Sequence, residues 1–330
     1  MSISPSSIKI AYNRIQAYVN TTPILQSSLL NEILSSHLYF KFEGAQKVGA
    51  FKARGAINTL LSLKEMNHLP KEIVAYSSGN HAQAVAWAAQ KLGIKATIIV
   101  PKFASEVKIA ATRGYGANII LTQERQEAED LSLQKAKEKG CFLLPPYDHD
   151  DVIIGQGTSA FEAWQNNIKY DAVFAPCGGG GLLSGTYLAT RFFSDSAQVF
   201  AAEPSTANDA SRSYHEGKIC RFSTTPQTIA DGARTLGVSE RTFHYIKQLD
   251  GFYEITEDEI IYWSQWLMHL MKVTLEPTAA LGMAAAYKWI NEGNEGKSIL
   301  IIISGANLDP KTYLQVWQNN YLNKLPTIAR

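Results

Sequence analysis

Four short segments of this sequence carry side chains whose chemistry fits together, although they lie far apart in the chain. They are residues 49–55 (GAFKARG), 77–81 (SSGNH), 177–181 (CGGGG) and 304–307 (SGAN). Each stands between an apolar run and a helical pattern, where α/β proteins place their binding groups. Together they supply a lysine amine, a receptor for a carboxylate, a cradle for a phosphate and a small hydroxyl. Such groups could hold a phosphorylated cofactor and act on an amino acid.

The glycine run at residues 178–181 is the strongest signal for a phosphate. Its unobstructed N–H groups and the start of the next helix favour an anion, whereas glycine is entropically costly in a plain connection. A Walker A loop is excluded because Leu182-Leu183-Ser184 follows the glycines. A dinucleotide fingerprint lacks its last glycine, but Glu203 stands where a ribose-binding acid would be expected. A nicotinamide cofactor therefore stays an alternative on this segment alone.

Lys52 favours a different cofactor. It lies between Phe51 and the run Ala53-Arg54-Gly55, at a predicted helix start in an apolar, glycine-flanked context. A lysine that attacks a carbonyl must be partly desolvated so that its amine is neutral. Most lysines are solvated surface residues, so Lys52 gains its significance from its companions. With the phosphate cradle they provide the parts that pyridoxal phosphate requires.

Residues 77–81 end one predicted strand and begin a helix. The hydroxyls of Ser77 and Ser78, the amide of Asn80 and free N–H groups at a helix N-terminus suit a carboxylate. Helix capping alone would need only one such side chain. His81 taken by itself is more often structural than catalytic, and the segment at residues 304–307 taken by itself could be a simple turn.

Composition describes an ordinary globular protein. The chain has 330 residues, 45% apolar and 18% charged, enough for two lobes or one large α/β unit. A net charge of +1 argues against nucleic acid or an anionic membrane as a partner. Cys141, Cys177 and Cys220 form no CxxC pair, so neither a disulfide framework nor structural zinc is expected. The first residues lack a signal-peptide pattern, and residues 299–303 are too few to span a bilayer. We expect a cytoplasmic protein.

Short apolar runs alternate with helical patterns from residue 73 onward, which is typical of parallel sheets covered on both faces. We expect strands at residues 73–76, 96–100, 118–121, 141–144, 172–175, 199–202 and 298–303, and helices at 81–92, 105–112, 125–139, 182–193, 256–271 and from 310. Thr256 and Glu259 have the spacing of a capping box. The predicted fold class is α/β, with two open, twisted, mostly parallel sheets and helices on both faces. The expected domains are a small one, residues 72–148, and a large cofactor-binding one, residues 1–71 and 149–330.

The whole motif set resembles the fold-type II (tryptophan synthase β-like) pyridoxal-phosphate enzymes, and more narrowly their serine/threonine dehydratase and serine racemase branch. The resemblance rests on residues 51–56, 77–81, 155–158 (GQGT), 177–181, 276–279 (EPTA) and 304–307. It extends from residue 22 to residue 307, which is nearly the whole chain. No single motif is decisive, but their joint occurrence in this order is specific.

The resemblance implies a role for each site residue. Lys52 would bond the cofactor aldehyde and act as base on the substrate α-carbon, and Ser78 would be a second acid/base on the opposite ring face. Ser304 would meet the pyridine nitrogen, where a serine in place of an aspartate gives a weaker electron sink and favours loss of the β-hydroxyl. The implied cofactor-binding residues are Phe51, Lys52, Asn80, Gly178, Gly179, Gly180, Gly181, Glu276 and Ser304. The implied substrate-binding residues are Ser77, Ser78, Gly79, Asn80 and His81.

A divalent cation is also implied. Residues 202–209 resemble the family's cation loop, with the carboxylates of Glu203 and Asp209 and the carbonyl of Ala207 as ligands. Hard oxygen ligands suit Mg²⁺, Ca²⁺ or Mn²⁺. The plainer interpretation is a capped helix start, in which Asp209 favours the helix dipole.

We therefore expect a dehydratase (ammonia-lyase) that converts L-serine or L-threonine to pyruvate or 2-oxobutanoate plus ammonia, with the eliminated water taken up again when ammonia is released. One alternative is a serine racemase with dehydratase side activity. Another is a 3-hydroxyaspartate dehydratase, for which Arg234 is the candidate to bind the second carboxylate. A catalytically silent cofactor-binding protein is a further alternative, against which Lys52 and Ser78 argue. The resemblance also implies a homodimer.

Two departures from the family pattern are visible. Ala82 follows His81 where the family usually has glycine, and we expect a mild effect. The chain also ends soon after the last motif, without the C-terminal regulatory domain of the feedback-inhibited threonine dehydratases. We therefore do not expect control by isoleucine.

Overall fold

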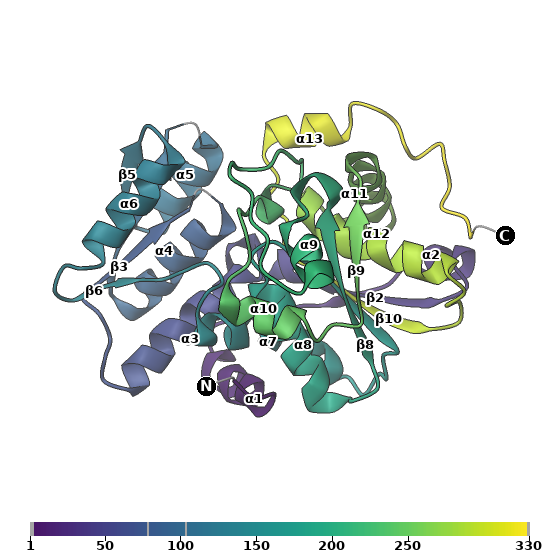
Figure 1. The fold of residues 1–330 in the computed structure, drawn as a ribbon, viewed down its shortest axis with the longest axis horizontal. Coiled ribbons are helices and arrows are strands. Elements are labelled where there is room, and N and C mark those ends of the chain that lie inside the picture. The colour runs from purple at the N-terminus through teal and green to yellow at the C-terminus, as the bar shows by residue number, and fades with distance from the viewer. Residues whose placement is uncertain (1–2, 78, 103, 329–330) are drawn as a thin grey trace.

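The larger of two sheets has six strands. The computed structural model describes residues 3–77, 79–102 and 104–328, and Figure 1 shows their elements. Within these residues the sheet order is β1-β2-β10-β7-β8-β9. β1 is antiparallel to β2, and the other neighbours pair in parallel. The strands are β1 (Ile24–Leu25), β2 (His37–Phe42), β7 (Ala172–Pro176), β8 (Gln198–Pro204), β9 (Gly251–Ile255) and β10 (Ser298–Ile303).

The smaller sheet has four parallel strands in the described part of the chain, in the order β5-β4-β3-β6. They are β3 (Glu72–Tyr76), β4 (Lys95–Pro101), β5 (Asn118–Thr122) and β6 (Cys141–Leu143), joined by α4 (Asn80–Leu92), α5 (Glu106–Gly114) and α6 (Arg125–Lys135). In Figure 1 this sheet stands to the left of the larger one. The two-sheet α/β class predicted from the sequence is confirmed, whereas the domain boundaries stay a prediction.

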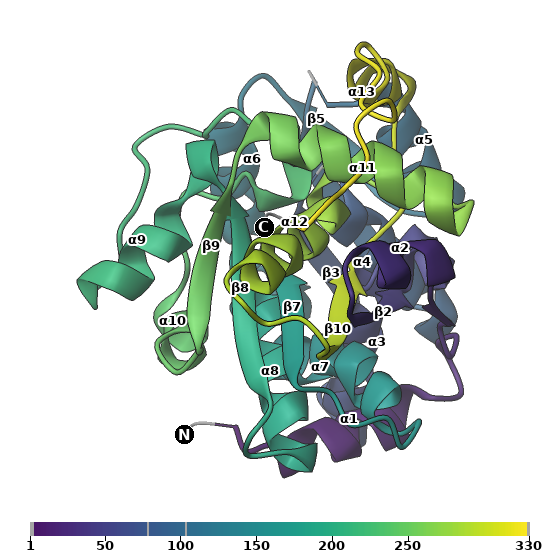
Figure 2. The same cartoon turned by 90° about the vertical axis from the view of Figure 1, so that its right-hand side faces the viewer.

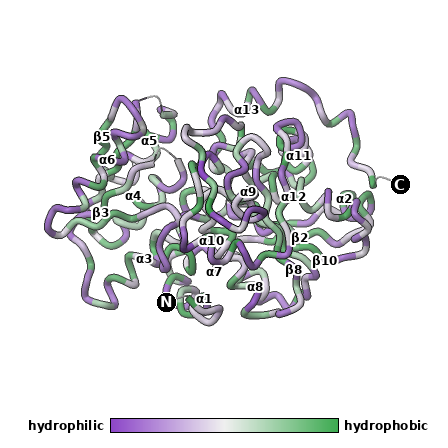
Figure 3. The backbone as a smooth tube through the Cα atoms, viewed as in Figure 1, coloured by the Kyte–Doolittle hydropathy of each residue, from purple (hydrophilic) through white to green (hydrophobic). Residues whose placement is uncertain are grey.

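Both faces of the larger sheet are covered by helices. Alternate side chains of β10 enter different cores: Ile299, Ile301 and Ile303 pack on one face, Leu300 and Ile302 on the other. The first face is covered by α2 (Ser28–Ile33), α11 (Glu257–Met271) and α12 (Pro277–Asn291), of which α12 crosses the strands in Figure 2. The second is covered by α1 (Ser6–Ile15), α7 (Asp150–Trp164), α8 (Gly181–Phe193) and α10 (Glu240–Ile246). Figure 3 shows hydrophobic stretches along these strands and their covering helices.

The smaller sheet is covered in the same way. Apolar residues of α4 pack on one face, together with those of α3 (Lys52–Glu65), and Ala128 of α6 packs on the other. The remaining helices are α9 (Asp209–Glu216) and α13 (Pro310–Val316). None of the helices in the described residues is long and apolar enough to cross a lipid bilayer.

Each sheet has a point where the strand order reverses, and both points open toward the predicted site. In the larger sheet β10 lies between β2 and β7, so the carboxyl ends of β10 and β7 are neighbours. In the smaller sheet β3 lies between β4 and β6, so the segments that follow β3 and β6 are neighbours. Ligands of open parallel sheets bind at such crevices. The four sequence segments are therefore brought together by topology.

The local predictions agree with the structure in most places. The capping box at the start of α11 is confirmed, because the Thr256 side chain accepts from the Glu259 N–H and the Glu259 carboxylate accepts from the Thr256 N–H. The helix predicted over residues 125–139 ends earlier, at Lys135. The chain there turns toward Gly140, whose φ of 89° lies in the left-handed region that a helix does not use.

Candidate active site

A pocket between the two sheets is lined by all four sequence segments. Its lining includes Lys52, Asn80, the glycine loop (residues 178–181) and Ser304. The other predicted residues on its wall are Phe51, Ser77, Gly79, His81 and Glu276. Ser78 lies outside the residues that the structure describes. The structure therefore brings together the described members of the predicted cofactor and substrate sets.

Lys52 is the first residue of α3, and its amine is held at the pocket wall. Nζ donates a hydrogen bond to the carbonyl of Pro146 at 2.7 Å and lies 4.9 Å from the centre of the Phe51 ring. Burial lowers the pKa of Lys52 to about 8, and the negative charge of Glu276 opposes the shift. A larger share of this amine is therefore neutral near neutral pH than in a solvated lysine.

In the glycine loop the backbone lies very close to the backbone of Gly232 and to the ring of Tyr147. Gly180, the residue before α8, has a φ of 86°, which favours glycine. A Cβ on Gly178 would stand 2.8 Å from the carbonyl oxygen of Gly232, and one on Gly179 would stand 2.2 Å from Cδ1 of Tyr147. The loop therefore presents bare backbone at the start of α8, which is a favourable place for a phosphate.

Asn80 and Glu276 join the two sheets across the pocket. Nδ2 of Asn80 donates to both carboxylate oxygens of Glu276, at 3.1 and 2.9 Å, and Oδ1 of Asn80 accepts from Nδ2 of Asn307 at 2.8 Å. Burial raises the pKa of Glu276 to about 7, and the nearby Asp231 carboxylate adds to the shift. Part of the Glu276 population is therefore protonated near neutral pH.

Ser304 follows β10 and is buried, yet its hydroxyl has no hydrogen-bond partner among the described residues. Its carbonyl accepts from the N–H of Phe51 at 3.1 Å, which ties the end of β10 to the segment that carries Lys52. Buried polar atoms nearly always have a partner. An unpartnered hydroxyl on a pocket wall thus points to a ligand atom as its partner.

The segment after β3 contributes one more buried titratable group. Nε2 of His81 donates to the carbonyl of Leu144 at 2.9 Å, which leaves the other ring nitrogen unprotonated in the neutral ring. Burial lowers the pKa of His81 to about 3, and the positive charge of Lys52 adds to the shift. His81 is therefore neutral at physiological pH. In the same segment the N–H of Gly79 donates to Oγ of Ser77 at 3.3 Å.

The predicted cation ligands lie at the end of β8 and just after it, next to β7, the strand that leads into the glycine loop. Glu203, Ala207 and Asp209 are all buried. Glu203 accepts from the N–H groups of Ala210 and Ser211, whereas neither carboxylate oxygen of Asp209 has a hydrogen-bond partner among the described residues. Burial raises the pKa of both carboxyl groups, that of Asp209 to about 7, and the charge of Asp209 adds to the shift at Glu203.

Two buried carboxylates of this kind would be stabilised by a cation between them. The set has only two carboxylates and one carbonyl. The described residues hold no group of three or more His, Cys, Asp or Glu side chains placed to bind a metal ion.

Several residues at the pocket were not singled out from the sequence. Pro146 and Tyr147 follow β6 after Leu144 and Pro145, and a pair of prolines with a tyrosine after a strand could have marked them. Lys108 of α5 forms an ion pair with Asp231 across the pocket, and no local pattern identifies this pair. Arg234 does line the pocket, and its guanidinium donates to the carbonyl of Pro226 and to the Gln227 side chain.

The GQGT motif at residues 155–158 lies in α7 and serves helix packing. A Cβ on Gly155 would stand 2.7 Å from Cα of Gly55, and one on Gly157 would stand 2.5 Å from the carbonyl oxygen of Gly185. Oε1 of Gln156 accepts from the N–H of Gly55 at 3.1 Å. The motif therefore allows α7 to approach α3 and α8 closely. The motif does not line the pocket, so it supports the site only through this helix packing.

The fold and the site define a class: an α/β protein whose buried lysine, glycine cradle and unpartnered serine converge at the crevices of two parallel sheets. A family profile described as "Pyridoxal-phosphate dependent enzyme" matches residues 15–305. The chain belongs to this family, and pyridoxal phosphate is its cofactor.

The relatives narrow the family to its ammonia-lyase and racemase branch. L-threo-3-hydroxyaspartate ammonia-lyase of Saccharomyces cerevisiae is 46% identical, over 92% of this chain and 93% of that protein. Serine racemase of Schizosaccharomyces pombe is 41% identical, over 92% and 94%. The solved structure of threonine deaminase isoform 2 from Solanum lycopersicum has a TM-score of 0.88 at 29% identity, covering 96% of this chain and 95% of that one. The predicted family is confirmed.

Proposed function

We propose that the protein is an ammonia-lyase for β-hydroxy amino acids, with L-serine and L-threonine as substrates and pyruvate and 2-oxobutanoate as products. The observation that carries the proposal is a pair of groups on the pocket wall: the unpartnered hydroxyl of Ser304, a serine that favours loss of the β-hydroxyl, and the Lys52 amine, whose pKa burial lowers to about 8. A group that takes a proton near neutral pH works best when its pKa lies near that pH. The net reaction converts one amino acid into one oxo acid and one ammonia.

The residues present fit pyridoxal phosphate. The bare backbone of the glycine loop at the start of α8 would bind its phosphate, and the unpartnered hydroxyl of Ser304 would bind its ring nitrogen. Asn80, oriented by Glu276, would bind the ring hydroxyl. When bound, the cofactor supplies the electron sink that makes the substrate α-proton acidic.

Lys52 would carry the proton chemistry of the chain itself. It lies at the start of α3, where burial keeps part of its amine neutral, and a neutral amine both bonds an aldehyde and accepts the α-proton. Ser78, as a proton donor on the other face, would be needed for racemisation and stays a prediction. Ser77, Gly79 and His81 likewise stay the predicted substrate-binding residues, beside Asn80.

A divalent cation, Mg²⁺ in the first place, would be held by the carboxylates of Glu203 and Asp209 and the carbonyl of Ala207. The oxygens of Asp209, to which the described residues make no hydrogen bond of good geometry, support this proposal, because a buried carboxylate that is poorly paired is costly. The charges of Arg212 and Arg221 offset part of this cost. The cation would neutralise the pair and hold the start of α9 in place beneath the glycine loop. Its role would be structural, because the site lies outside the pocket wall.

L-threo-3-hydroxyaspartate is a second candidate substrate. The 46% identity to a protein named for that activity favours it, and so do the cations that line the pocket, among them Lys108, Arg221 and Arg234. A second carboxylate on the substrate needs such a cation. Relatives named serine racemase keep D-serine formation as a third candidate.

One assay separates these candidates. The purified protein, loaded with pyridoxal phosphate and Mg²⁺, is given L-serine, L-threonine or L-threo-3-hydroxyaspartate, and the oxo acid and D-serine are quantified in the same sample. Pyruvate with little D-serine supports the proposal. D-serine at an equal or greater rate favours the racemase, and turnover of L-threo-3-hydroxyaspartate alone favours the second candidate. The Lys52→Ala variant must lose every activity, and turnover in that variant would refute the role of Lys52.

The proposed assembly is a homodimer in the cytoplasm, with a small domain at residues 72–148 and the remainder of the chain in the large domain. This part of the proposal rests on the family resemblance and on the separation of the two sheets in sequence. Light scattering on the purified protein tests the dimer. A monomer that retains full activity would contradict it.

A further inference from the structure

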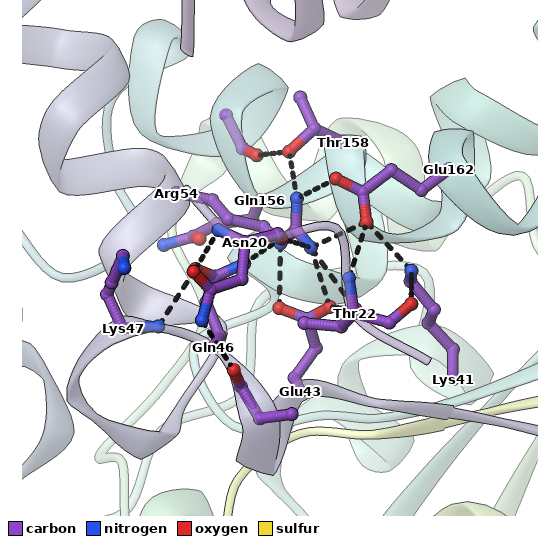
Figure 4. A network of polar contacts seen from close by, with 12 residues as sticks. Asn20, Thr22, Lys41, Glu43, Gln46, Lys47, Arg54, Gln156, Thr158 and Glu162 are labelled. Atoms are coloured by element: carbon purple, nitrogen blue, oxygen red, sulfur yellow. Dashed lines mark hydrogen bonds and ion pairs between the residues drawn. The ribbon is translucent and has the colours of Figure 1, made fainter. Parts of the chain in front are cut away.

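Figure 4 shows a cluster of four buried charged side chains, one of which, Arg54, lies two residues after Lys52 in α3. The cations are Lys41 of β2 and Arg54 of α3, and the carboxylates are Glu43, just after β2, and Glu162 of α7. Each of these side chains is at most 3% exposed. Two cations and two carboxylates balance, so the cluster is neutral as a whole.

Arg54 holds both carboxylates. Its Nε and Nη2 donate to Glu43 at 2.7 and 2.9 Å, and its Nη1 and Nη2 donate to Glu162 at 2.7 and 2.9 Å. Nζ of Lys41 donates to Glu162 and to the carbonyl of Thr22, each at 2.7 Å, and the Thr22 hydroxyl donates to Glu43 at 2.6 Å. Paired donation of this kind fixes orientation as well as distance.

Stability alone is a weak reason for such a cluster. The hydration that buried charges lose offsets most of their mutual attraction, so apolar side chains of the same shape would serve the core equally well. What the cluster adds is a fixed geometry that links β2, α3 and α7. The residues that need this geometry lie in the loop above it.

The ion pair between Glu43 and Arg54 closes a strained loop that contains Lys52. Val48, within this loop, has a φ of 57° and a ψ of 14°, a left-handed conformation that β-branched residues avoid. Gly49 follows with a φ of 69°. Backbone of this kind persists only where the surrounding contacts hold it. The loop would otherwise relax, and Lys52 would move with it.

Contacts at the other end of the loop hold it against β10. Nδ2 of Asn307 donates to the carbonyl of Val48 at 2.7 Å, and the N–H of Ala306 donates to the carbonyl of Gly49 at 2.9 Å. The Asn307 amide also donates to Asn80. The loop is therefore held at its tip by the pocket and at its base by the Glu43–Arg54 pair.

Arg54 and Lys52 leave opposite sides of the first turn of α3. Residues two apart on a helix are separated by about 200° around its axis. The Lys52 amine accordingly reaches Pro146 on the pocket wall while the Arg54 guanidinium is buried in the charge cluster. A shift of Arg54 must therefore tilt the turn that carries Lys52.

We propose that the Glu43–Arg54 ion pair positions Lys52. The pair holds together the two ends of the strained loop between these residues and so fixes the position of the Lys52 amine in the pocket. Glu43 and Arg54 are positioning residues, because they touch neither substrate nor cofactor. The inference rests on the proposed role of Lys52. It assigns a functional reason to a buried charge cluster that stability does not require.

Two variants test the proposal. Glu43→Gln keeps the shape of the side chain but removes its charge. The milder Thr22→Val removes the hydroxyl that donates to Glu43 and accepts from Nη2 of Arg54, and it keeps all four charges. Three quantities are measured: Tm, kcat and KM with the preferred substrate, and the rate at which borohydride fixes added pyridoxal phosphate on Lys52 of the apoprotein. That labelling rate reports the amine without any turnover.

We expect Glu43→Gln to slow the labelling of Lys52 and to lower kcat by about tenfold to a hundredfold, the range for a displacement near 1 Å, with little change in KM. Thr22→Val should move both rates in the same direction by less. The control is Ile290→Ala, a fully buried residue at the far end of α12, chosen to lower Tm without touching the pocket. Its labelling rate and kcat should equal those of the wild type.

Labelling and kcat that stay at wild-type values in Glu43→Gln and Thr22→Val, at a Tm lowered as in Ile290→Ala, would overturn the proposal. Should Glu43→Gln fail to fold, Thr22→Val decides alone. A wild-type protein that is labelled on Lys52 but forms no oxo acid refutes the proposed activity, and the labelling rates still test the positioning. Absence of labelling on wild-type Lys52 refutes the inference itself.

Discussion

The ring of Tyr147 lies against the backbone of Gly179, so that a Cβ on this glycine would stand 2.2 Å from Cδ1 of the ring. The Tyr147 hydroxyl donates to the carbonyl of Gly237 at 3.1 Å, which prevents the ring from turning away freely. A side chain on Gly181 would also meet Tyr147, at 2.9 Å from its Cβ. The segment after β6 therefore forms one wall of the glycine loop that follows β7, the proposed binding site of the phosphate.

Gly179→Ala should weaken cofactor binding. The added methyl group must displace the ring or the loop, and overpacking of this kind costs about 1–3 kcal/mol. Titration of the apoprotein with pyridoxal phosphate, followed by absorbance, measures the loss. Gly114→Ala is the matched control, because a Cβ there meets nothing within 4 Å. Equal affinity for pyridoxal phosphate in Gly179→Ala and the wild type would show that the ring or the loop moves aside without any loss of binding free energy.

Ser304→Ala should lower the affinity for pyridoxal phosphate while leaving folding stability unchanged. The hydroxyl has no hydrogen-bond partner among the described residues, so its removal leaves no protein group unpaired. A lost hydrogen bond to the ring nitrogen costs about 0.5–1.5 kcal/mol. The dissociation constant and Tm are measured together, with Ser298→Ala at the other end of β10 as the control. A drop in the Tm of the apoprotein would reveal a structural role for this hydroxyl instead.

The rate at which the apoprotein captures pyridoxal phosphate should rise with pH and level off near pH 8. Only the neutral amine attacks an aldehyde, and burial lowers the pKa of Lys52 to about 8. Below this pH the rate should fall about tenfold per unit. Glu276→Gln removes a charge that raises this pKa, so the plateau should begin at lower pH. A rate that still climbs at pH 10 would indicate an amine with the pKa of a solvated lysine.

Local signals in the sequence were sufficient for the glycine loop and for seven of the ten strands in the described residues, whereas β1, β2 and β9 were not predicted. The strand predicted over residues 298–303 is β10 without change, because an unbroken apolar run followed by Ser-Gly has few other interpretations. Gly180 takes the left-handed φ that a glycine run before a helix suggests. Residues 77–81, 177–181 and 304–307 directly follow parallel strands at the crevices, as the βα pattern indicates. Residues 49–55 follow β2 only after two short 3₁₀ turns, and the sequence predicted no strand before them.

Contacts between distant segments could not be predicted in the same way. Nothing in the local sequence marks Glu162, whose partners Arg54 and Lys41 lie 108 and 121 residues away in the chain. Nothing near Tyr147 in the sequence places its ring beneath the glycine loop. The GQGT motif signals the family, but its physical role, close packing of α7 on α3 and α8, is visible only in three dimensions.

Mg²⁺ should raise the Tm of the wild-type protein and have no effect on Asp209→Asn. A ligand that binds only the folded state at a hundredfold excess over its Kd stabilises that state by about 2.7 kcal/mol. Without metal, Asp209→Asn should be at least as stable as the wild type, because it removes a buried carboxyl group whose ionisation burial disfavours. Thermal unfolding with EDTA and then with added Mg²⁺ or Ca²⁺ measures both effects. A wild-type Tm that ignores the cation would refute the proposed site.

Arg234→Gln should distinguish a substrate with a second carboxylate from one without. Arg234 lines the pocket and is oriented by the Pro226 carbonyl and the Gln227 side chain, so its guanidinium is held in place before substrate binds. A charged hydrogen bond to a substrate carboxylate contributes about 1.5–3 kcal/mol. If Arg234 makes this bond, kcat/KM for L-threo-3-hydroxyaspartate should fall by about tenfold to a hundredfold. The value for L-serine should change much less.

Lys311→Gln supplies the control, because Lys311 lines the same pocket but is exposed at the start of α13. The loss of this charge should change kcat/KM for the two substrates by the same factor. An equal fall in kcat/KM for both substrates in Arg234→Gln would mean that Arg234 supports the pocket wall and does not bind the second carboxylate. The cation for a dicarboxylate substrate would then be sought at Lys108, whose existing ion pair with Asp231 such a substrate would have to break.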